Sequence, residues 1–69
     1  MNIIEKELES RRSEIKKAVE LLFKANMKIT DWDIPEVDDT EAAKLLITII
    51  KDEVEKIEQD IAEGKYENY

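Results

Sequence analysis

The chain has 69 residues and a net charge of −7, so it is long enough for one small domain and should repel the phosphate backbone of a nucleic acid. It contains no cysteine and no histidine, which excludes disulfides, thiolate zinc sites and the commonest general base. The first residues carry charges where a signal peptide would have its apolar core, and no apolar run is long enough to span a bilayer. We therefore expect a cytoplasmic protein without a membrane segment.

The apolar residues of the first half recur with a helical period. They are Ile4, Leu8, Ile15, Ala18, Leu22, Ala25 and Ile29, at spacings of three, four and seven. Asn2 followed by Glu5 is typical of the capping box that opens a helix. The pattern predicts an amphipathic helix over residues 3–27, with Arg11 as the one charged residue on its apolar stripe.

The two halves of the chain differ in charge. Residues 1–28 carry a net +2, whereas residues 29–69 carry a net −9. We expect the basic residues around Arg11 to pair with carboxylates of a second helix, or Arg11 to bridge to a second subunit. Direct contact with nucleic acid is not expected from so acidic a chain.

We predict a connecting loop over residues 28–38, because Pro35 and its polar neighbours interrupt the helical pattern. Inside it, Asp31, Trp32, Asp33 and Ile34 place the only tryptophan between two acidic residues. Two interpretations stay open: Trp32 and Ile34 turn inward with Val37 to cover the end of a core, or the four residues bind another protein. Eleven residues are more than a helical pair needs, which favours a functional loop.

The second half repeats the helical pattern. Its apolar residues are Ala43, Ile47, Ile50, Val54, Ile57 and Ile61. Asp38, with Glu41 three residues later, supplies the start signal, and Gly64 suits a left-handed helix end. We therefore predict a helix over residues 39–63 and a short tail over residues 64–69.

Each helix carries more apolar residues than one stripe can use. Leu21 and Phe23 flank the first stripe, and Leu45 and Ile49 lie off the second. Leaving each in water would forgo about 1.5–3 kcal/mol, so we expect these four to form an interface with a second copy or with a protein partner. The predicted fold is all-α: a two-helix antiparallel hairpin, forming one domain over residues 1–69, that dimerises into a four-helix bundle.

An acidic ridge on the second helix offers one alternative. Asp52, Glu55 and Glu58 are spaced three apart and resemble the magnesium-holding ridges of all-α nucleotide pyrophosphohydrolases of the MazG family, which implies a magnesium-dependent hydrolase. That family uses a Glu-Glu-x-x-Glu set on another helix, which the first helix here lacks. A solvated helix face is the interpretation we favour, so we expect no enzymatic activity, no metal and no cofactor.

These features together predict a small acidic protein–protein interaction module, acting as an adaptor, inhibitor or regulator on a basic and hydrophobic site of another protein. Ten isoleucines and nine lysines suggest an AT-rich gene, as in many phages and mobile elements. The alternative is an acidic nucleic-acid mimic that inhibits a DNA-binding protein. Its phosphate-like carboxylates would be Glu41, Asp52, Glu55, Glu58 and Glu63. A magnesium-dependent hydrolase fragment is the third hypothesis.

Overall fold

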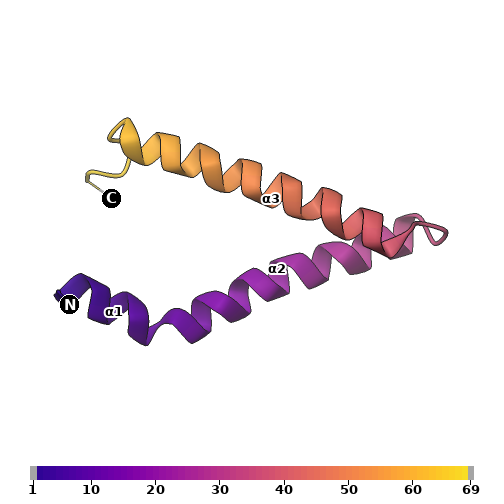
Figure 1. Cartoon of the computed structure of the whole chain (residues 1–69), viewed down its shortest axis with the longest axis horizontal. Coiled ribbons are helices and arrows are strands. Elements are labelled where there is room, and N and C mark those ends of the chain that lie inside the picture. Colours follow the sequence, from indigo (N-terminus) through magenta and orange to yellow (C-terminus); the bar gives the residue numbers. More distant parts are fainter. Residues whose placement is uncertain (1, 69) are drawn as a thin grey trace.

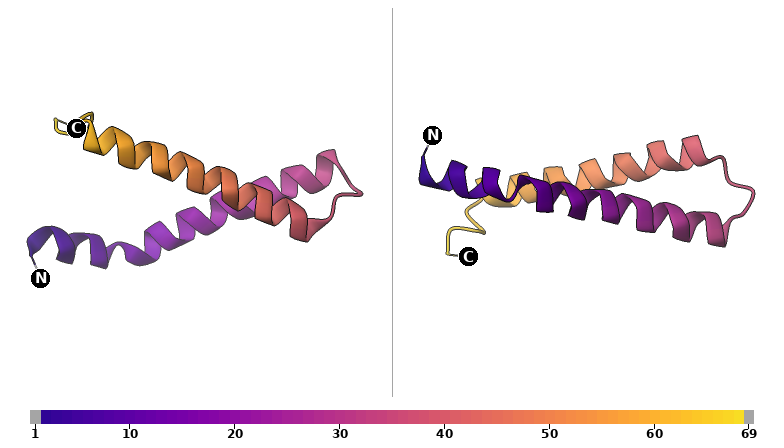
Figure 2. Two further views of the ribbon diagram at one scale, coloured as in Figure 1. Left: turned by 45° about the horizontal axis from the view of Figure 1, so that its top comes forward. Right: turned by 90° about the horizontal axis from the view of Figure 1, so that it is seen from below.

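The computed structural model describes residues 2–68, and this part of the chain is all-α, as predicted. Its elements are α1 (Ile3–Ser10), α2 (Arg12–Asp33) and α3 (Asp39–Ala62). In Figure 1, α1 and α2 form one arm of a V and α3 forms the other, with the connection between α2 and α3 at the narrow end. Figure 2 shows that the arms also cross, so the V is not flat.

The V is an extended shape. The radius of gyration is 16.0 Å and the principal extents are 48 × 27 × 17 Å. A compact domain of this length would have a radius of gyration of about 11 Å. The arms are closest near the turn, and they are far apart at the N- and C-terminal ends of the chain, a wide opening that we call the mouth (Figure 1).

The first arm begins as predicted but is interrupted. The side chain of Asn2 caps α1 by accepting a hydrogen bond from the backbone of Glu5 at 2.8 Å. The single helix predicted over residues 3–27 is wrong, because the chain leaves helical geometry at Arg11, with φ −100° and ψ 1°. The hydroxyl of Ser10 donates to the carbonyl of Glu7, and such side-chain competition for helix carbonyls favours a bend.

The predicted end of the first helix at residue 27 is also wrong, since α2 continues to Asp33. Proline restricts the residue before it to extended geometry, and Ile34, with φ −132° and ψ 81°, is where the helix stops. The amide of Val37 donates to the carbonyl of Ile34 at 3.0 Å and closes a tight turn around Pro35. The connection is therefore residues 34–38, five residues in place of the expected eleven.

The ends of α3 follow the local signals in the sequence. Asp38 accepts hydrogen bonds from the amides of Thr40 and Glu41 at 2.9 and 3.3 Å, which confirms the predicted cap. At the other end Gly64 has φ +81°, the left-handed conformation that glycine adopts most easily. The amide of Lys65 donates to the carbonyl of Asp60, so the described part of the tail turns back on the helix; Tyr69 lies outside the described residues.

Membrane spanning was not expected, and no helix within residues 2–68 combines the length and the apolar character that crossing a bilayer requires.

Candidate functional site

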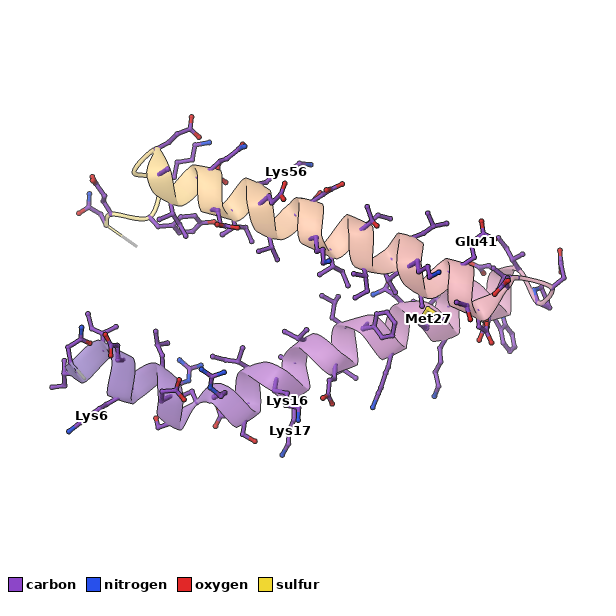
Figure 3. All side chains as sticks on the ribbon, in the orientation of Figure 1. Lys6, Lys16, Lys17, Met27, Glu41 and Lys56 are labelled. Carbon is purple, nitrogen blue, oxygen red and sulfur yellow. The ribbon has the colours of Figure 1, made fainter. Side chains whose placement is uncertain are left out.

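Contact between α2 and α3 is confined to a short seam beside the turn. Within residues 2–68 the only buried residue is Ala42. The half-buried seam residues are Phe23, Asn26, Met27 and Thr30 on α2, and Ala43, Leu46 and Ile50 on α3. Figure 3 places Met27 where the two arms meet. The small side chains of Ala42 and Ala43 let the helix backbones approach here, so the seam lies at the narrow end of the V.

The seam uses a different face of α2 from the one predicted. The predicted stripe contains Leu22 and Ile29, yet both remain exposed. Their neighbours Phe23 and Thr30 are the residues that are half-buried on the side of α2 that faces α3. Leu21, Leu22 and Phe23 are all apolar, so the helical period of apolar residues is the same for the face through Leu22 and for the face through Phe23. On α3 the seam passes through Leu46, and the predicted stripe residue Ile47 lies at its edge.

Two apolar grooves continue the seam along α3, each with a volume of about 380 Å³. The first is lined by Leu22, Asn26, Leu46, Ile49, Ile50, Glu53, Val54 and Ile57. The second is lined by Thr30, Ile34, Val37, Glu41, Ala42, Leu45, Leu46 and Ile49. Leu46 and Ile49 line both grooves, so together they form one continuous surface, which we call the apolar face.

The four predicted interface residues are not equivalent. Leu45 and Ile49 lie on the apolar face and are both exposed, so the structure brings this pair together. Phe23 is half-buried in the seam, and Leu21 is exposed but lines neither groove. Val54 and Ile57 belong to the apolar face too; they had been assigned to a buried stripe, because the periodicity does not reveal that the arms diverge.

The total exposed area is large for a chain of this size. The total accessible surface is 6493 Å². A compact monomer of 8.1 kDa exposes about 4500 Å², since accessible surface grows as roughly the 0.73 power of mass. The excess of about 2000 Å² is comparable with what one partner buries in a large protein interface. A single copy therefore leaves its apolar surface without a cover.

The second candidate surface is the acidic end of the V. Asp31, Trp32 and Asp33 form the last turn of α2, and Ile34 follows at the helix end. The indole of Trp32 is 86% exposed, so the interpretation that it covers the core is wrong. At 100° per residue, Trp32 lies about 200° around the helix from the seam residue Thr30, which is the opposite side. Ile34 and Val37, in contrast, do line the apolar face.

Carboxylates crowd this end of the molecule. Residues 31–41 hold six acidic residues and no basic one. A hydrogen bond with the carboxyl of Asp39 raises the pKa of Asp31, with smaller contributions from desolvation and from the charge of Asp39. Asp31 and Asp33 also sit at the negative end of the α2 dipole, where a carboxylate is destabilising. A cationic partner would relieve both effects.

The ion pairs of residues 2–68 are all local, and the predicted pairing of Arg11 with α3 is wrong. Arg11 lies 3.7 Å from Glu14, and Arg12 binds the carboxylate of Glu9 through two nitrogen atoms across the helix break. This contact lowers the pKa of Glu9 and raises that of Arg12. Both pairs lie within the first arm, which diverges from α3 toward the mouth (Figure 1).

The acidic ridge of α3 is solvated. Asp52, Glu55 and Glu58 are exposed, and within residues 2–68 no group of three or more acidic side chains is arranged to hold a metal ion. Lys56, which lies among them, binds Glu53 at 3.0 Å, and this contact raises the pKa of Lys56. The magnesium hypothesis gains no support from this geometry.

No family model, curated protein or solved structure matches the chain.

Proposed function

We propose that this chain is a small acidic protein–protein interaction module, which acts as an adaptor, inhibitor or regulator by binding a basic and hydrophobic site on another protein. The observation that carries the proposal is the exposure of Trp32 between Asp31 and Asp33. A large aromatic side chain with carboxylates around it is the composition of an interface hot spot with a charged rim. Ile34 completes the recognition surface beside the turn.

The proposed fold of this module is an antiparallel helical hairpin formed by α2 and α3, extended at its open end by α1. Its apolar face supports assembly into a homodimer with the architecture of a four-helix bundle. The uncovered area supports the same proposal, because a small chain cannot reach the usual stability of a domain while leaving so much apolar surface in water.

Affinity purification from the native host tests the recognition surface. The bait is compared with Trp32→Ala and with Asp31→Asn combined with Asp33→Asn. We expect both variants to lose the proteins that the wild-type bait retains, with helicity by circular dichroism unchanged, because the side chain of Trp32 is 86% exposed. Glu7→Gln combined with Glu67→Gln is the control, since it removes two exposed carboxylates from the other end of the molecule. Equal retention by all baits would exclude residues 31–34 as the binding surface.

An acidic nucleic-acid mimic is the second candidate, because exposed carboxylates follow one another along α3 and its end. They are Glu41, Asp52, Glu55 and Glu58 on α3 and Glu63 at its C-cap. Duplex DNA should then compete with the chain for its captured partner, and binding should weaken steeply with salt. Binding that is insensitive to both would leave the Trp32 surface as the explanation.

A further inference from the structure

We infer that the apolar face is covered by a second copy of this chain turned end for end, so that the acidic turn of each copy lies in the mouth of the other, beside Arg11 and Arg12. This inference rests on the proposed homodimer and deepens it by naming the orientation of the second copy and the residues that meet. Surface area, helix length and charge each support it.

The area matches an obligate dimer. A compact protein of twice this mass would expose about 7500 Å², whereas two separate copies at 6493 Å² each expose much more. If the dimer were as compact as a protein of twice this mass, its formation would bury the difference between the two areas, about 5500 Å² in total. This is at the upper end of the range for obligate homodimers. The excess of about 2000 Å² on each copy is more than the roughly 800 Å² that one partner buries in a standard interface, which favours a partner the size of this chain over a short peptide.

Helix length sets the register. The 22 residues of α2 span about 33 Å and the 24 residues of α3 span about 36 Å. If two copies overlap over the full length of α3 in opposite directions, the turn of one copy therefore falls beside residues 11 and 12 of the other. The shape agrees as well, because one copy has a narrow end and a wide mouth (Figure 1), and in this arrangement the narrow end of each copy would enter the mouth of the other.

The charges of the two turns favour this orientation over the parallel one. Two turns placed side by side would bring twelve carboxylates from residues 31–41 together with no basic residue among them. In the end-for-end arrangement, each group of six faces Arg11 and Arg12, which within their own copy pair with Glu14 and Glu9. Arg11 lies three residues after Leu8 and four before Ile15, so it interrupts an apolar stripe. Within its own copy its ion pair, to Glu14, is 3.7 Å long.

The arrangement leaves the indole of Trp32 accessible, although Ile34 and the acidic residues of the turn face the second copy. Trp32 lies on the side of α2 opposite the seam, so covering the apolar face does not cover the indole. The dimer therefore presents two Trp32 side chains at opposite ends, which allows it to bind two copies of a target.

Spin-label distances in solution test the orientation, because the chain has no native cysteine. Glu36→Cys places a label on the turn, and Lys51→Cys places one at the middle of α3. End-for-end packing predicts a distance of about 36 Å or more between the two turn labels, and a clearly shorter one between the two labels at residue 51. A turn-to-turn distance as short as the mid-helix distance would establish parallel packing and overturn the inference.

Charge reversal provides a second test that needs no label. We expect Arg11→Glu combined with Arg12→Glu to weaken dimerisation about tenfold, from the small contributions of several partly exposed pairs. Lys16→Glu combined with Lys17→Glu changes the net charge equally, but these lysines project from α2 on the side away from α3 (Figure 3), so dimerisation should be unaffected. Equal effects of the two pairs would contradict a specific contact at Arg11 and Arg12.

Sedimentation equilibrium separates failure of this inference from failure of the proposed function. A mass of twice 8.1 kDa is expected. A chain that stays at 8.1 kDa but binds the apolar dye ANS would overturn the second copy as the cover, while the exposed face would still call for another protein. A monomer that binds no ANS would contradict the exposed apolar face itself.

Discussion

Two isoleucines on α3 provide a sharp test of whether the apolar face is covered in solution. Ile49 lies on the apolar face and is 60% exposed in the single copy, whereas Ile47 lies on the other edge of α3 and is 39% exposed. The perturbation is the same at both positions, truncation to alanine. The order of the two losses in stability depends on what covers Ile49.

The magnitudes follow from the exposed fractions. Full burial of an isoleucine side chain stabilises by about 1.5–3 kcal/mol, so in a single copy Ile49→Ala should cost about 1 kcal/mol and Ile47→Ala about 1.5 kcal/mol. If a second protein buries Ile49 completely, its truncation should cost about 2–5 kcal/mol per copy, because a cavity forms in a packed interface. The order of the two variants is then reversed.

The assay is urea unfolding followed by far-UV circular dichroism. We expect Ile49→Ala to lower the free energy of unfolding more than Ile47→Ala does. For the wild-type dimer, the apparent free energy of unfolding should fall by about 1.4 kcal/mol for each tenfold dilution of the protein. A greater loss at Ile47 than at Ile49, together with a transition that does not move on dilution, would refute the reasoning.

Two further predictions concern local features. Because its pKa is raised in the folded chain, Asp31 binds its proton more tightly there than in the unfolded chain; its contribution to stability is present at low pH and is lost as the pH rises through the folded-state pKa. Asp31→Asn should therefore raise the urea midpoint near pH 7 relative to Asp33→Asn, and equal midpoints would contradict a repulsive contact with Asp39. Gly64→Ala should lower the free energy of unfolding by about 1 kcal/mol, because φ is +81° there. The added methyl would lie 3.4 Å from the side chain of Glu67. If Gly64→Ala costs the same free energy of unfolding in a Glu67→Ala variant, the cost comes from the backbone angle and not from a clash with Glu67.

The ends of the helices illustrate what could be predicted. Asn2, Asp38 and Gly64 act through hydrogen bonds or a backbone angle within a few residues, so their effects are visible in the sequence. The end of α2 was placed too early because the polar residues before Asp33 have only modest helix propensity. Propensity is a weak signal, and Pro35 is the first residue that physically prevents the helix from continuing.

The candidate site was predicted in part. The sequence indicated surplus apolar residues and singled out Leu45 and Ile49, which lie together on the apolar face. It did not indicate which face of α2 meets α3, since adjacent apolar ridges satisfy the same period. The exposure of Trp32 also follows from the helix continuing past residue 30, so an error of six residues in the helix end reversed the direction assigned to the side chain.

The sequence by itself determined the all-α class, the helix caps, the acidic turn and the presence of more apolar surface than one stripe can use. These properties depend on composition and on contacts between near neighbours. Only the tertiary structure decided that the arms meet at Ala42, diverge into a V and leave the apolar face open. The reason is geometric: period and propensity constrain each helix separately, whereas the angle between two helices depends on which side chains interdigitate where they cross.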